Sequence, residues 1–170
     1  MSGIFSNKTH RFYNYLPFKK TTKAKAKTFV FTLLASTAVA QTYSVSAADM
    51  PNTCPVDGCE VSILSIEKSE NELKLTLESN FTPDNSKNHF HMWWGEQYKS
   101  EQVGSNAKSE YNVEQGKWHR HDDYPVYTTT GSASVEVREG ATTLCITAAD
   151  GDHNVLDPQN FHCMDVSEYL

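Results

Sequence analysis

The sequence of residues 60–170 predicts an all-β fold. Apolar and polar residues alternate with a period of two in several short runs, which is typical of half-buried strands. Gly, Asp, Asn and Pro residues separate these runs, as turns between antiparallel strands require. The chain has 170 residues, 38% of them hydrophobic, which is enough for one modest globular domain, and no second domain is expected.

The first two expected strands form a hairpin. They cover Glu60–Ile66 and Asn71–Glu78 and flank a charged turn at Glu67–Glu70. In the second run leucine occupies every other position and polar residues stand between, so one face of this strand should be buried.

A third strand is expected over Asn88–Gly95, where two kinds of side chain alternate. One face carries Phe90, Met92 and Trp94, and the other carries His89, His91 and Trp93. Successive strand residues point to opposite faces. The apolar face should therefore meet the core, and the histidine face should be accessible to solvent.

Four further strand-like runs complete the expected fold. They are Tyr124–Thr130, Ser132–Arg138, Thr142–Ala148 and Phe161–Val166. The segment Glu96–Trp118 is polar and has no clear period, although a helical turn fits Ser100–Lys108; loops of this length are often functional or ordered by a ligand. Together the runs predict an antiparallel immunoglobulin-like β-sandwich of about seven strands, with a small barrel as the alternative.

Residues 1–47 are predicted to be a signal peptide. Five lysines in residues 19–27 precede Thr28–Ala40, an uncharged and mostly apolar run. Small residues follow and match the A-x-A-like cleavage pattern at residues 45–47, with residues 38–40 as the alternative. We therefore expect an exported protein, periplasmic or extracellular.

The exported chain should comprise a disulfide-closed N-terminal segment, residues 48–59, and the β-sandwich domain, residues 60–170.

Charge and hydropathy exclude two classes of partner for this exported chain. Of the 15 basic side chains seven lie in residues 1–47, which leaves eight against all 21 acidic ones, a net charge of −13. Such a surface repels nucleic acid. No apolar run reaches about 18 residues, so stable membrane insertion after signal removal is not expected.

Export makes disulfides the expected state of the four cysteines. Cys54 and Cys59 flank a Pro and an Asp-Gly pair, which bend the chain. Cys145 and Cys163 lie in neighbouring strand-like runs joined by a turn-rich segment. We expect the disulfides Cys54–Cys59 and Cys145–Cys163. A redox-active role for the first pair is the alternative, although its spacing differs from C-x-x-C.

Five histidines are the candidate metal ligands. His89 with His91, and His119 with His121, form two H-x-H pairs, and residues at i and i+2 of a strand point to the same face. Imidazoles placed in this way can converge on copper or zinc. His153, in an Asp-rich turn, is the expected third ligand beside His89 and His91. Binding should weaken below about pH 6, where ordinary imidazoles protonate. The alternative is that these are plain surface histidines.

We interpret the sequence as an exported, non-catalytic binding module with a copper or zinc site. Asp150 and Asp152 are expected to hold His153 in a liganding tautomer. A small metal-dependent enzyme, hydrolytic or copper-redox, is the alternative, with Asp122, Asp152 or Glu96 as base. A purely structural or adhesion envelope domain is the other alternative. Motifs for a nucleophile, a P-loop or a dinucleotide site do not occur in the sequence.

Aromatic residues gather in the central third of the chain. They are Trp93, Trp94, Tyr98, Tyr111, Trp118, Tyr124 and Tyr127. Exposed, they could stack on an extracellular ligand such as a carbohydrate, whereas strand aromatics usually belong to the core.

An ordered series of short motifs resembles a group of uncharacterised exported bacterial domains. The motifs are His89-Phe90-His91, Glu101-Gln102-Val103-Gly104, Gly140-Ala141-Thr142-Thr143-Leu144-Cys145, Asp152-His153 and His162-Cys163. The resemblance implies an immunoglobulin-like fold without an assigned activity. It also implies that His89, His91, His153 and the Cys145/Cys163 pair belong to one architecture. The second histidine pair, at residues 119 and 121, has no fixed counterpart in that pattern.

Cleavage of the signal peptide gives the first testable prediction. The exported protein should begin near Ala48, because the order of basic, apolar and small residues ends there. Mass spectrometry of the exported form checks this, and an intact Thr28–Ala40 segment in that form would contradict it.

Overall fold

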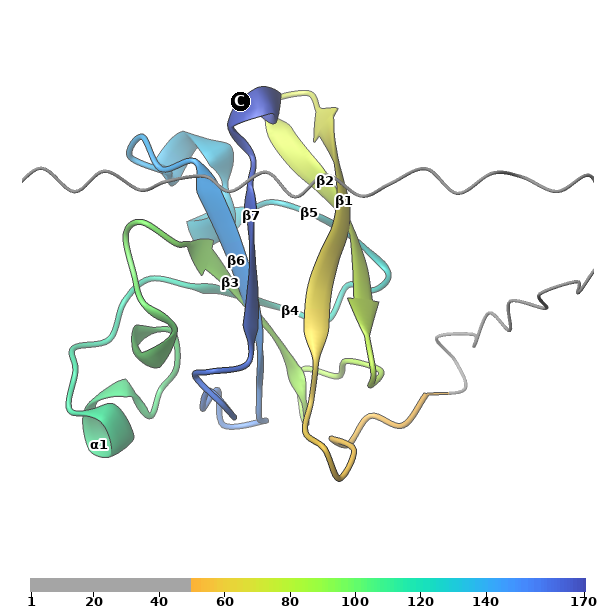
Figure 1. Ribbon diagram of the computed structural model, residues 1–170, viewed down its shortest axis with the longest axis vertical. Coiled ribbons are helices and arrows are strands. Elements are labelled where there is room, and N and C mark those ends of the chain that lie inside the picture. Colours follow the sequence, from red (N-terminus) through yellow and green to blue (C-terminus); the bar gives the residue numbers. More distant parts are fainter. Residues whose placement is uncertain (1–49) are drawn as a thin grey trace, which may run out of the picture. The chain divides into compact units, whose positions relative to one another are not determined.

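The computed structural model describes residues 50–170, and the predicted signal peptide lies outside the described residues. The described part of the chain is built from seven strands in two antiparallel sheets (Figure 1). Its one α-helix, α1 (Ala107–Tyr111), has five residues. No helix in this part is long and apolar enough to cross a membrane.

Each sheet has a simple order of strands. The first sheet has the order β1–β2–β5, formed by Val61–Ser69, Glu72–Ser79 and Val126–Thr128. The second has the order β4–β3–β6–β7, formed by His119–His121, His89–Trp94, Thr143–Ala149 and Phe161–Asp165. Short 3-10 helices, η2 to η5, occupy Ser100–Gln102, Gly131–Ala133, Val135–Val137 and Ser167–Tyr169.

The hairpin of β1 and β2 is present and tighter than expected. β1 continues to Ser69, and the chain reverses over two residues, with Glu70 in the left-handed conformation (φ 55°). The expected turn at Glu67–Glu70 is too long because Glu67 is a strand residue. Its carboxylate lies 3.6 Å from the ammonium of Lys74, its direct cross-strand partner.

One hydrophobic core joins the two sheets. The leucines of β2 at positions 73, 75 and 77 are all buried, as the period of two predicts. They belong to the same cluster as Phe90, Met92 and Trp94 of β3 and as Leu144 and Ile146 of β6. The all-β prediction is thereby confirmed, while the immunoglobulin-like topology stays a prediction.

The expected strand over Ser132–Arg138 is wrong. This segment forms the helices η3 and η4. The Glu72 carboxylate explains the difference, because it accepts hydrogen bonds from the hydroxyl groups of Thr129 and Ser134 and from the backbone N–H of Val135. These bonds hold the segment in turns beside the start of β2.

One strand, β4, lies at His119–His121, outside the strand-like runs expected from the sequence. Of the expected run Tyr124–Thr130, only Val126–Thr128 is a strand, and Pro125 before it has no N–H for a ladder. β4 (His119–His121) instead pairs with β3 and forms one edge of the second sheet.

The outer face of the second sheet is covered by two segments. Trp93 and Cys145 of this face form a second hydrophobic cluster with Val103, which follows η2, and with Val155. α1 and the coil around it lie on the side of the sheet away from β1 and β2 (Figure 1). Both faces of β3 are therefore buried, and all six of its residues are inaccessible.

The structure contains the disulfides Cys54–Cys59 and Cys145–Cys163. Cys145 and Cys163 are direct cross-strand partners on β6 and β7. The second bridge links the two segments of the chain that carry the last two strands of the second sheet.

Removal of the Cys145–Cys163 bridge should lower the melting temperature more than removal of Cys54–Cys59. The bridges close loops of 18 and 5 residues, for which the chain-entropy relation gives about 3 and about 2 kcal/mol. Thermal unfolding of the two double Cys→Ala variants measures the difference. Equal melting temperatures, or a larger loss in the Cys54/Cys59 variant, would refute the ranking.

Candidate metal centre

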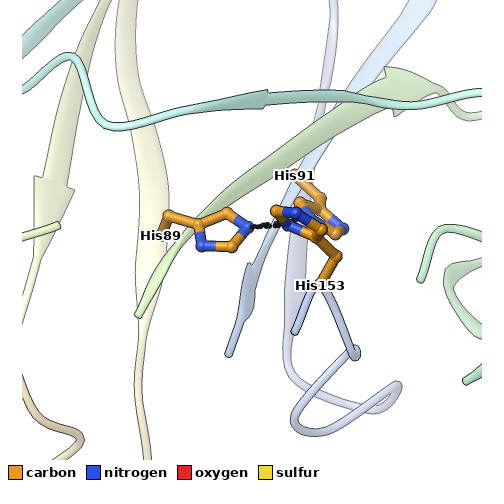
Figure 2. Close-up of side chains that lie close together, drawn as sticks. All are labelled: His89, His91 and His153. Atoms are coloured by element: carbon orange, nitrogen blue, oxygen red, sulfur yellow. Dashed lines mark hydrogen bonds between the residues drawn. The ribbon is translucent and has the colours of Figure 1, made fainter. Parts of the chain in front are cut away.

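Three histidines from two distant parts of the chain come together beside the second sheet (Figure 2). His89 and His91 project from β3, and His153 comes from the turn that follows β6. One ring nitrogen of each lies within 4.8 Å of those of the other two. The sequence predicted this trio, and the structure shows that it could hold a metal ion.

The turn that presents His153 is built by Asp150. Its carboxylate oxygen Oδ1 accepts the backbone N–H groups of Asp152 and Asn154, at 2.9 Å each. This leaves His153 in the left-handed conformation (φ 65°), which a non-glycine residue rarely adopts. The expectation that Asp150 holds the imidazole is therefore not met, because its carboxylate serves the backbone of the turn.

The expected solvent access of the His89–His91 face is wrong. Both side chains are 0% exposed, whereas His153 is half-buried. The cause is the covering segment that contains Val103. It is tied to the His153 turn by the Ser105 N–H, which donates to the His153 carbonyl at 2.7 Å.

A backbone carbonyl orients His91. Its Nδ1 lies 2.6 Å from the carbonyl oxygen of Val103. A carbonyl only accepts, so Nδ1 carries the proton and Nε2 presents a lone pair toward His89. Hydrogen bonds of this kind fix the tautomer of metal-binding histidines.

Arg120 contacts the third histidine. Its Nη1 lies 2.8 Å from Nε2 of His153. Because a guanidinium only donates, Nε2 is the acceptor and Nδ1 of the neutral ring carries the proton. That Nδ1 lies 3.0 Å from Nε2 of His89, to which it donates.

These contacts leave two lone pairs facing each other. Nε2 of His89 accepts from His153, and Nε2 of His91 is unprotonated, yet the two atoms are only 3.1 Å apart. Four contacts link Arg120, His153, His89, His91 and Val103 in this order. With all three rings neutral, no placement of protons turns every one of these contacts into a hydrogen bond. A cation bound by the Nε2 atoms of His89 and His91 removes the repulsion between their lone pairs, and it takes the single His89 lone pair that otherwise accepts from His153.

Burial keeps the rings of His89 and His91 neutral. Loss of hydration lowers the pKa of His89 to about 4, and the nearby His153 and Arg120 act in the same direction. The same desolvation lowers the pKa of His91 to about 3, against the opposing effect of its bond to Val103. The sequence alone predicts that metal binding weakens below about pH 6, because this expectation assumes the ordinary pKa of histidine. The rings of His89 and His91 protonate only at lower pH.

An indole ring lies against the cluster. Trp118 stacks on His91 with ring centroids 3.8 Å apart and an interplanar angle of 15°. Three of the aromatic residues proposed to stack on an extracellular ligand belong to the core instead, because Trp93, Trp94 and Tyr127 are at most 2% exposed. The only sequence signal that Trp118 lies near histidines was its place next to the second H-x-H pair.

The second histidine pair does not join the three-histidine group. His121 pairs with Phe90 across the sheet and therefore shares the face of Phe90, while Arg120 pairs with His91 and shares the face of the cluster. His121 is buried and stacks on Tyr127, with ring centroids 3.7 Å apart. Desolvation lowers its pKa to about 3.

Glu96, expected as a base in the enzymatic alternative, is engaged elsewhere. Its carboxylate accepts hydrogen bonds from the backbone and hydroxyl groups of Thr142 and Thr143. Burial opposes its ionisation, but these bonds outweigh burial and lower its pKa to about 2. Glu96 therefore stabilises the start of β6.

Comparisons with known proteins give no further identification. No family model, no curated protein and no solved structure matches this chain. The resemblance to exported bacterial domains stays a prediction.

The free energy of unfolding of the metal-free protein should fall as the pH is lowered from 6.5 toward 4. In this window the unfolded chain binds protons at His89, His91 and His121 with the ordinary pKa of 6.5, and the folded chain does not. The expected loss between pH 7.5 and pH 5 is about 2 kcal/mol for each buried histidine.

Urea denaturation in the presence of a chelator measures this profile. A His121→Phe variant keeps the stacking on Tyr127 and removes one titrating ring, so its profile should be shallower than that of the wild type. Identical profiles, or a wild-type stability that is constant from pH 7.5 to 5, would show that burial does not suppress protonation.

Proposed function

We propose that this protein is an exported, non-catalytic binding module that holds one copper or zinc ion through His89, His91 and His153. The observation that carries the proposal is the close approach of the Nε2 atoms of His89 and His91, 3.1 Å apart, with a ring nitrogen of His153 beside them. The two disulfides support an oxidising compartment and hence export. The immunoglobulin-like sandwich is proposed as its scaffold.

The donor set favours these two metals. Neutral imidazole nitrogens suit copper and zinc, whereas calcium and magnesium prefer oxygen ligands. Intrinsic affinity favours Cu²⁺ and cellular availability favours Zn²⁺. The bond from His91 to Val103 supplies the outer contact that liganding histidines usually make.

Replacement of His153 by Asn should weaken metal binding by at least about 100-fold, since loss of outer contacts alone typically costs 10- to 100-fold. Asn tolerates the left-handed backbone of this position, so the variant should fold. Calorimetric titration with Cu²⁺ and with Zn²⁺ measures the affinity, and quenching of Trp118 fluorescence by Cu²⁺ gives a second readout.

His119→Asn is the matched control. It removes an H-x-H histidine outside the three-histidine group and should leave the affinity unchanged. Equal affinity of His153→Asn and wild type, or no binding tighter than about millimolar in either, would contradict the proposal and favour the structural or adhesion alternative. Hydrolytic or redox activity that a chelator abolishes would instead favour the metalloenzyme.

A further inference from the structure

We propose that the metal-loaded site binds a small carboxylate-like anion, with Arg120 as its counter-charge next to the metal. This inference rests on the proposed function. It concerns the ligand that completes the coordination of the metal, for which three nitrogen donors leave a position in a four-coordinate ion.

The register of the sheet brings Arg120 to the cluster. It is the direct cross-strand partner of His91, and its guanidinium reaches Nε2 of His153 at 2.8 Å. Its side chain is exposed, so this side of the cluster meets solvent. The two ion pairs found among the described residues, Lys74–Glu67 and Lys108–Glu114, do not involve Arg120.

Metal binding by His153 releases this arginine. In the metal-free protein Nδ1 of His153 carries a proton, and a protonated nitrogen cannot ligate. When Nδ1 binds the metal, the proton of the neutral ring moves to Nε2, with no net gain or loss of protons. An Nε2–H group cannot accept from Arg120, so the guanidinium must turn away from His153.

The released guanidinium adds to an excess of positive charge. The three imidazoles are neutral ligands, so the divalent metal and Arg120 together place three positive charges at the cluster. Asp122 and Asp150 act on His89 only as nearby charges, and Asp150 is bonded to its own turn. These two carboxylates offset two of the three positive charges, and a monoanion bound to the metal and to Arg120 offsets the third.

The shape of the guanidinium selects the class of anion. Its planar fork of N–H donors matches the two oxygens of a carboxylate or bicarbonate, and charge-assisted bonds of this kind are about twice as strong as neutral ones. One oxygen can bind the metal while the other accepts from Arg120. A compact spherical anion such as chloride uses the fork poorly.

The experiment starts from wild-type protein loaded with Cu²⁺, titrated with acetate, bicarbonate and azide and followed by its visible and electron paramagnetic resonance spectra. The spectra should shift on saturation with each anion. Arg120→Gln should weaken acetate binding at least about tenfold, the loss expected for one charge-assisted hydrogen bond. Lys117→Gln, an exposed lysine with the same change of charge, should leave it unchanged.

Two further measurements test separately the release of Arg120 by the metal and the role of its planar fork in anion binding. Arg120→Gln should bind the metal no more weakly than wild type, because it removes a contact that metal binding must break; weaker metal binding would overturn the release step. Arg120→Lys keeps the charge without the fork and should bind acetate with intermediate affinity. Spectra that do not respond to anions, or equal acetate affinity of Arg120→Gln and wild type, would overturn the inference and leave the metal site standing. If wild type binds no metal, the proposed function falls as well.

Discussion

The position of β3 inside the second sheet is the constraint on which the rest of the site depends. β4 and β6 bond to its two edges, so its residues cannot rotate from one face to the other without loss of both ladders. Phe90 therefore faces the core together with Ala148 of β6, and His91 faces the covering segments together with Thr147. The same register places Arg120 beside His91 and sends His121 to the opposite face.

The three-histidine cluster is a costly arrangement for the chain. Nδ1 of His89 is buried and has no hydrogen-bond partner among the described residues, and an unsatisfied polar group of this kind costs about 1–3 kcal/mol. The facing lone pairs of His89 and His91 and the left-handed backbone of His153 add to this cost. The hydrophobic core and the disulfides offset these terms, so the fold can hold the three rings in place before any ligand binds.

Sequence periodicity predicted the part of this arrangement that a single strand determines. The alternation over Asn88–Gly95 identified which side chains share a face, and the Asp-rich turn identified His153 as their partner. It did not predict what covers the histidine face, because that depends on contacts of Val103 and Val155 with residues far away in the chain. The 3-10 helices over residues 131–137 were missed for the same reason, since the carboxylate that holds them lies on β2. A local pattern carries no signal for such long-range bonds.

Burial also decides from which side the proposed ion reaches the site. His89 and His91 are inaccessible, and Trp118 lies flat against His91, so the half-buried His153 and the exposed Arg120 form the side that solvent reaches. His153 therefore lies on the side from which the proposed ion would reach the two buried rings. Its turn is held mainly by Asp150 and by the bond from Ser105, a smaller set of contacts than holds β3 between its two neighbours. Rigid ligands on a central strand combined with one ligand on a turn allow an ion to exchange without unfolding of the sheet.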